Sequence, residues 1–101
     1  MLFSVATFPI GDGPSLHKSV AEVVDAIDGA GLHYEVGPAD TVIEGDWASV
    51  MPVLQRAEER LRAHHDRVFM IITIDDYAGV ENRLHTAVAE VERELHRTLT
   101  H

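Results

Sequence analysis

A run of seven apolar or β-branched residues, Val68-Phe69-Met70-Ile71-Ile72-Thr73-Ile74, decides the fold of this chain. Its length and residue types predict a β-strand within residues 67–75. In a sheet that helices cover on one face, strands alternate apolar residues inward with polar residues outward. This run does not alternate, because Phe69 and Ile71 face away from the side that Met70 and Ile72 occupy. The sequence therefore predicts a sheet whose second face is also apolar.

Three further strands and three helices are predicted around that run. The strands are residues 2–8, 32–36 and 41–44, and the helices are residues 16–29, 49–63 and 80–98. The order β-α-β-β-α-β-α contains the split βαβ unit of the ferredoxin-like fold. Right-handed crossovers place the first two helices on one face of a four-stranded antiparallel sheet. We expect an α+β ferredoxin-like βαββαβ sandwich plus a C-terminal helix, formed by residues 1–101 as one domain.

The ends of the first two helices depend on a few residues. Ser15 is a plausible N-cap of the first helix, which ends near Gly29 or Gly31. Asp46 is a possible cap of the second helix, but Pro52 would then clash with the carbonyl four residues back. A start at Ser49 puts Pro52 in the tolerated first turn, so we expect the helix to begin there.

Composition excludes several classes of function. The 101 residues include eight Lys or Arg against seventeen Asp or Glu, a net charge of −9, and no cysteine. Disulfides and thiol nucleophiles are excluded, and nucleic acid and anionic membranes are not expected partners. No apolar run is long enough for a transmembrane helix, and the N-terminus lacks the pattern of a signal peptide, so we expect a cytoplasmic protein. The seven histidines lack the i, i+4 spacing of a helical zinc site, so no metal site is assigned.

The apolar second face of the sheet needs a cover. Leu2, Ala6 and Phe8 join Phe69 and Ile71 on that face, and a patch of this kind usually marks an interface. We expect a homodimer or homotetramer that associates through the sheet face. The alternative is that the third helix of the same chain covers the patch.

Glu44 is the carboxylate of greatest interest. It ends an apolar strand and is followed by Gly45 and by Trp47, the only tryptophan. A flat cationic heterocycle needs a stacking face, a counter-charge and a hydrogen-bond acceptor. The alternative is that Trp47 packs at the helix entry and Glu44 is exposed.

Two other features have weaker interpretations. Gly11-Asp12-Gly13 precedes a helix and either binds an anion at its N-terminus or is a plain turn. Asp75 and Asp76 end the last strand, but neighbouring strand residues point to opposite faces and do not converge.

At these positions the chain resembles the small thiamine-binding protein family. The resemblance covers nearly the whole chain and is strongest at Thr41-Val42-Ile43-Glu44-Gly45-Asp46-Trp47. The remaining matching segments are Pro9-Ile10-Gly11, Gly31-Leu32-His33-Tyr34-Glu35, Arg67-Val68 and Ile74-Asp75-Asp76.

The resemblance implies a ferredoxin-like protein that associates through its sheets, binds thiamine or its hydroxymethylpyrimidine moiety, and has no catalytic machinery. Tyr77 stands where the family commonly has arginine, and Ala87 where it has lysine. Both changes remove positive charge, so thiamine suits this chain better than thiamine pyrophosphate.

We therefore predict a non-catalytic binding protein for thiamine or a related pyrimidine, with no cofactor of its own. Glu44 would meet the aminopyrimidine or the thiazolium charge, and Thr41 would supply a hydroxyl. The other predicted ligand-binding residues are the walls Trp47, Tyr34 and Phe8 and a hydrogen-bond acceptor, Asp75. The alternatives are a structural or regulatory oligomerisation module and a ferredoxin-like dimeric enzyme.

Overall fold

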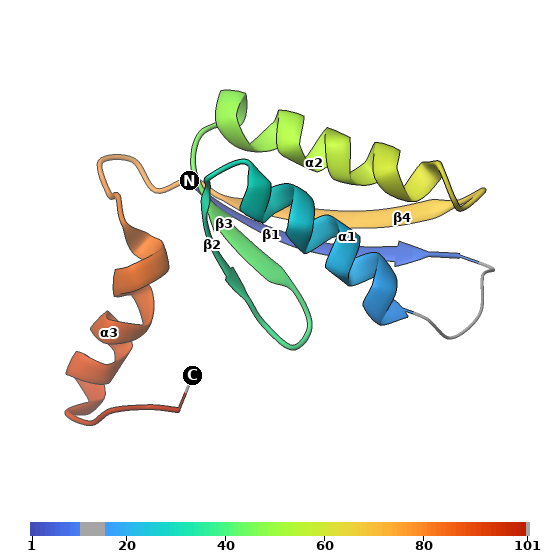
Figure 1. Cartoon of the computed structure of the whole chain (residues 1–101). Helices are drawn as coiled ribbons and strands as arrows, with labels where there is room; N and C mark the ends of the chain where they lie inside the picture. Colours follow the sequence, from blue (N-terminus) through green and yellow to red (C-terminus); the bar gives the residue numbers. More distant parts are fainter. Residues whose placement is uncertain (11–15, 101) are drawn as a thin grey trace.

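The computed structural model of the chain describes residues 1–10 and 16–100. The described elements follow the predicted order and form a four-stranded antiparallel sheet with three helices, as expected for an α+β ferredoxin-like fold (Figure 1). Their bounds are β1 Leu2–Pro9, α1 Leu16–Gly29, β2 His33–Val36, β3 Thr41–Glu44, α2 Trp47–Arg62, β4 Val68–Asp75 and α3 Arg83–Leu95. Ser15 and Gly11-Asp12-Gly13 lie outside the described residues.

The sheet has the strand order β2-β3-β1-β4, and every neighbouring pair is antiparallel. Central strand β1 pairs with β4 along its whole length but with β3 over only half of it. Helices α1 and α2 lie over the same face, which we call the inner face (Figure 1). The opposite, outer face carries Phe8, Phe69 and Ile71.

The core lies between the inner face and the two helices. Phe3 of β1 and Ile43 of β3 are fully buried, and Ile27 of α1 and Leu54 of α2 meet them from the helix layer. The buried residues of the helices recur at the three- and four-residue spacing of an amphipathic helix. In α2 this spacing produces one buried stripe, which consists of Val50, Val53, Leu54, Ala57 and Leu61.

Helix α2 begins earlier than the sequence predicted. Asp46 is its N-cap and accepts a hydrogen bond from the Ser49 N–H at 2.8 Å, so the expected start at Ser49 is wrong. Pro52 consequently lies inside the helix. It is tolerated because Pro52 and Ala48, the residue whose carbonyl loses its partner, are both exposed, so water can hydrate that carbonyl.

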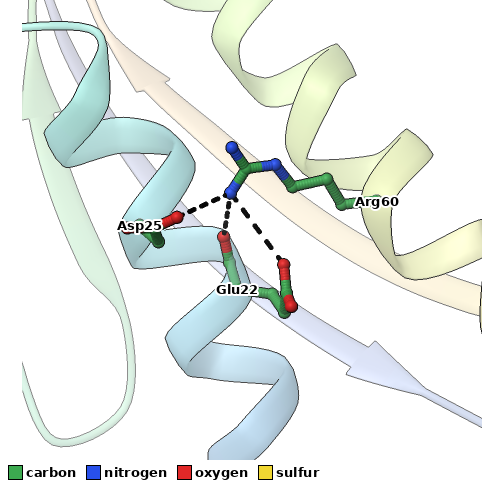
Figure 2. A network of polar contacts seen from close by, with 3 residues as sticks. All are labelled: Glu22, Asp25 and Arg60. Atoms are coloured by element: carbon green, nitrogen blue, oxygen red, sulfur yellow. Dashed lines mark hydrogen bonds and ion pairs between the residues drawn. The ribbon is translucent and has the colours of Figure 1, made fainter.

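A polar contact joins the two helices at the surface. The Arg60 guanidinium donates to Asp25 Oδ2 at 2.9 Å and lies 3.9 Å from Glu22 Oε2 (Figure 2). All three side chains are largely exposed, so this network adds little stability beside the core.

Helix α3 is shorter at both ends than the predicted span 80–98. Asn82 before it and His96 after it adopt left-handed backbone conformations, with φ values of 60° and 56°. The Arg97 N–H bonds to the Glu92 carbonyl at 3.1 Å, which closes the C-terminal turn. Neither boundary has a glycine or proline that would reveal it in the sequence.

Helix α3 does not cover the apolar outer face. It lies beside β2 and β3, away from the α1–α2 layer, and none of its residues is buried (Figure 1). Phe69 and Ile71 remain 50% and 45% exposed. The outer face of β1 and β4 is therefore left uncovered by the described part of the chain.

Candidate functional site

The six predicted ligand-binding residues do not form one cluster. Glu44 of β3 and Asp75 of β4 lie at one end of the outer face, where they pair with Leu2 of β1 from its two sides. Trp47 lies on the first turn of α2, and Tyr34 is on edge strand β2. Thr41 and Phe8 line the same hollow, which lies between β1, α1 and the turn that joins β2 to β3.

Glu44 is engaged by α3. Its carboxylate accepts hydrogen bonds from the Arg83 N–H at 2.8 Å and from the Leu84 N–H at 3.1 Å. These are orphan donors of the first helical turn, which a carboxylate satisfies well. Glu44 thus caps a helix that begins 39 residues later in the chain.

Asp75 is engaged by the same helix. Its carboxylate accepts a hydrogen bond from the Arg83 guanidinium, and that bond raises the pKa of Arg83 above its ordinary value. The guanidinium also lies 5.6 Å from the centre of the Tyr77 ring. Positive charge is therefore present beside Tyr77, although the arginine common in the family is missing at that position.

Trp47 packs at the entry of α2. Its ring meets Phe3 edge to face, with 5.8 Å between ring centres, and it remains half exposed. With Met51 and Ile72 it lines an open hollow on the α2 side, whereas Glu44 lines a different hollow beside Met1. The aromatic plane and the carboxylate that the sequence analysis combined do not converge.

Tyr34 joins β2 to the end of α1. Its hydroxyl donates to Asp28 Oδ1 at 2.8 Å, and this bond to a carboxylate raises the pKa of Tyr34. The ring is half-buried against the core. Tyr34 is thus tied to a structural contact.

A hollow near two of the predicted residues lies between β1, α1 and the turn that joins β2 to β3. It has a volume of about 290 Å³, at the lower limit of small-molecule sites. We call it the β1–turn hollow. Its walls are mainly apolar and include Val5, Phe8, Val20, Val23 and Pro38.

Thr7 is the most informative residue of the β1–turn hollow. It continues the inner-face series of Phe3 and Val5, is 7% exposed, and its Oγ1 has no hydrogen-bond partner within the described chain. A buried hydroxyl without a partner costs about 1–3 kcal/mol, and a polar ligand or an ordered water in the hollow would supply the missing partner. The available signal was a polar residue that continues an apolar inner face, but the sequence analysis did not single it out.

Asp40 is a second residue that sequence analysis missed. It lines the β1–turn hollow, and its carboxylate accepts a hydrogen bond from the Ser4 hydroxyl. The Gly37 N–H donates to the Asp40 carbonyl at 2.8 Å, which closes the turn. The turn therefore holds the Asp40 carboxylate against Ser4 of β1, at the margin of the hollow.

Within residues 1–10 and 16–100, no three His, Asp or Glu side chains cluster as metal ligands would. Nor does any described helix have the length and hydropathy required to cross a bilayer.

Comparison with known sequences places the chain among a set of related proteins. It is 38% identical over 98 residues to UPF0045 protein Mb1933 of Mycobacterium bovis, with 96% of each chain covered. It is 30% identical over 100 residues to a UPF0045 protein of Staphylococcus xylosus, with 93% and 94% covered.

Solved structures share the fold. A hypothetical protein of Methanocaldococcus jannaschii, MJ1052, superposes with a TM-score of 0.83 at 24% identity over 89% of this chain and 93% of that one. A Thermotoga maritima protein provisionally assigned to thiamine biosynthesis or salvage superposes with a TM-score of 0.76, also at 24% identity, over 89% and 96%. Finally, the sequence model of a family described as thiamine-binding protein matches residues 3–92.

Proposed function

Because this chain belongs to the thiamine-binding protein family, we propose that it is a non-catalytic binding protein for thiamine or its hydroxymethylpyrimidine moiety. The observation that carries the proposal is the β1–turn hollow with the unpartnered hydroxyl of Thr7 at its base. Two of the predicted ligand-binding residues, Thr41 and Phe8, line it. We place the ligand there.

The lining of the hollow favours a flat ring without phosphate. Apolar walls suit the faces of an aromatic heterocycle, and a few polar groups fix its orientation. Asp40 supplies a negative charge, and the described residues of the lining include no Lys or Arg. With a net charge of −9, the chain favours cationic thiamine over its pyrophosphate.

The proposal of a non-catalytic role draws support from Glu44 and Asp75. An enzyme of this fold needs a general base within reach of an enclosed site. These two carboxylates, which are the strongest candidates in the sequence, are hydrogen-bonded to the first turn of α3. Their contacts point to a role in attaching α3.

Calorimetric titration tests the proposed function. Thiamine and hydroxymethylpyrimidine should bind saturably with micromolar affinity, and thiamine pyrophosphate should bind more weakly. Val20→Ala should weaken binding because it removes part of one wall of the hollow, whereas Phe69→Ala on the outer face should not affect the hollow directly. Absence of heat with all three ligands would refute a thiamine-binding role and favour the assembly module.

We also propose that a second copy of the chain covers the outer face. Phe8, Phe69 and Ile71 are 38–50% exposed there, and a two-fold axis would let each copy cover the same patch of the other. Sedimentation velocity tests this assembly. The wild type should sediment as a dimer or tetramer, and Phe69→Asp should produce a monomer that keeps its secondary structure.

A further inference from the structure

Strand β1 extends beyond the strand that pairs with one of its edges. It pairs with β4 from Leu2 to Pro9, but with β3 only from Leu2 to Val5. Residues 6–9 therefore have a neighbouring strand on one side only. The β1–turn hollow occupies the place that a longer β3 would fill.

Two backbone hydrogen bonds establish which residues of β1 face that gap. The Ile10 N–H donates to the Arg67 carbonyl at 2.9 Å on the β4 side, and the Gly45 N–H donates to the Met1 carbonyl at 3.0 Å on the β3 side. Backbone groups of successive residues in an antiparallel strand alternate between its two neighbours. The backbone groups of even-numbered residues of β1 therefore point toward β4, and those of odd-numbered residues point toward the β3 side.

Thr7 is the first odd-numbered residue beyond the end of the β1–β3 pairing. Its N–H and C=O thus point toward the gap, where a continued β3 would place Ala39. Ala39 instead belongs to the turn, and no hydrogen bond joins the turn to Thr7 among the residues that the structure describes. Thr7 offers a backbone donor, a backbone acceptor and a buried hydroxyl around one hollow.

We propose that the main chain of Thr7 is the recognition edge of this site and pairs with an aminopyrimidine-type heterocycle. Such a ring carries an amino donor beside a ring-nitrogen acceptor, so it can exchange two hydrogen bonds with Thr7 as an opposing strand residue would. The Thr7 hydroxyl and Asp40 complete the polar surroundings, while Val20 and Val23 cover one face of the ring. The identity of the ligand rests on the proposed function, whereas the recognition edge rests on the register of the sheet.

Two small probes test the recognition edge on the full chain. 4-Amino-2-methylpyrimidine carries the donor beside the acceptor, whereas 2,4-dimethylpyrimidine keeps the ring nitrogens but has a methyl group in place of the amino donor. NMR titration of isotope-labelled protein should show the Thr7 amide among the most shifted, with the Ile10 amide, which is bonded to β4, much less affected. The amino probe should bind about tenfold more tightly than the dimethyl probe, which corresponds to one lost hydrogen bond.

A pair of threonine variants tests the hydroxyl. Thr7→Val keeps the shape and the backbone edge but removes Oγ1, and should weaken the amino probe roughly three- to tenfold. Thr73→Val, on the exposed outer face of β4, is the matched control and should leave the affinity unchanged.

The possible outcomes separate this proposal from the function it rests on. If the amino probe shifts the Thr7 amide resonance but thiamine does not bind, the recognition edge is supported and the thiamine-binding role is refuted. If thiamine binds while the Thr7 amide is unmoved and both probes bind equally, the role stands and the edge is refuted. If no probe binds, both fail.

Discussion

Replacement of Glu44 by alanine tests how α3 is attached to the sheet. The half-buried carboxylate accepts two backbone hydrogen bonds, from Arg83 and Leu84. A hydrogen bond to a charged acceptor is worth about 1.5 kcal/mol at the low end of its range, so the pair is worth roughly 3 kcal/mol. That corresponds to a factor of about 150 in the equilibrium between attached and detached α3. Because α3 has no buried residues, the contacts left to hold it are at the surface, such as the ion pair of Arg83 with Asp75.

Amide hydrogen exchange measures this effect locally. In Glu44→Ala the amides of α3 should exchange much faster, while those of α2, which packs in the core, should keep their protection. Glu44→Gln retains one good acceptor oxygen and should show a smaller effect. Glu35→Ala is the matched control, because Glu35 is an exposed glutamate on neighbouring strand β2.

Two results would refute this account of Glu44. If α3 exchanges equally fast in the wild type and in Glu44→Ala, the two hydrogen bonds do not hold the helix. If the amides of α2 lose protection to the same extent as those of α3, Glu44 supports the whole domain. In either case the attachment of α3 would need another explanation.

Two further substitutions test the entry of α2. Gly45→Ala should destabilise the protein by about 1–3 kcal/mol in urea unfolding, because its Cβ would lie 2.8 Å from Cγ2 of the fully buried Val50. Gly29→Ala, where an added Cβ meets nothing within 4 Å, should be neutral or stabilising, and equal losses in both variants would contradict the steric argument. Asp46→Ala should lower the Tm at pH 7, because it removes the cap of α2. The hydrogen bond from Ser49 holds the pKa of Asp46 below its usual value, so the cap stabilises the fold above about pH 4 and is lost as the pH falls through the folded-state pKa. The Tm difference between the wild type and Asp46→Ala should therefore vanish in acid, and a difference that persists there would refute the cap.

Local patterns were sufficient to predict the order of elements and most strand bounds. The strand at residues 41–44 agrees with β3, because Asp40 and Gly45 delimit a short β-branched segment. The predicted start of α2 was wrong because the cost of Pro52 inside a helix depends on the exposure of that side of the helix, which the sequence does not show. The ends of α3 depend on left-handed residues that carry no glycine signal.

The candidate site was less predictable, because it depends on contacts between distant segments. That Glu44 is a helix cap follows from α3 lying beside β3, which no local spacing reveals. The backbone groups of Thr7 are free to bind a ligand because β3 begins opposite Val5, and only the register of the sheet shows this. A hollow that arises from unequal strand lengths has no sequence motif of its own.

Helix α3 is hydrogen-bonded to the sheet at its N-terminal end, so a tilt there displaces its C-terminal end most. Its thirteen residues span about 20 Å, and its fixed point lies at Glu44. A tilt of about 10° at that point would therefore move Leu95 by roughly 3–4 Å, while the two hydrogen bonds need change little. The half-exposed side chains of Val91 and Leu95 lie on the moving end. A small adjustment at the end of β3 would thus produce a much larger displacement of the apolar side chains at the far end of α3.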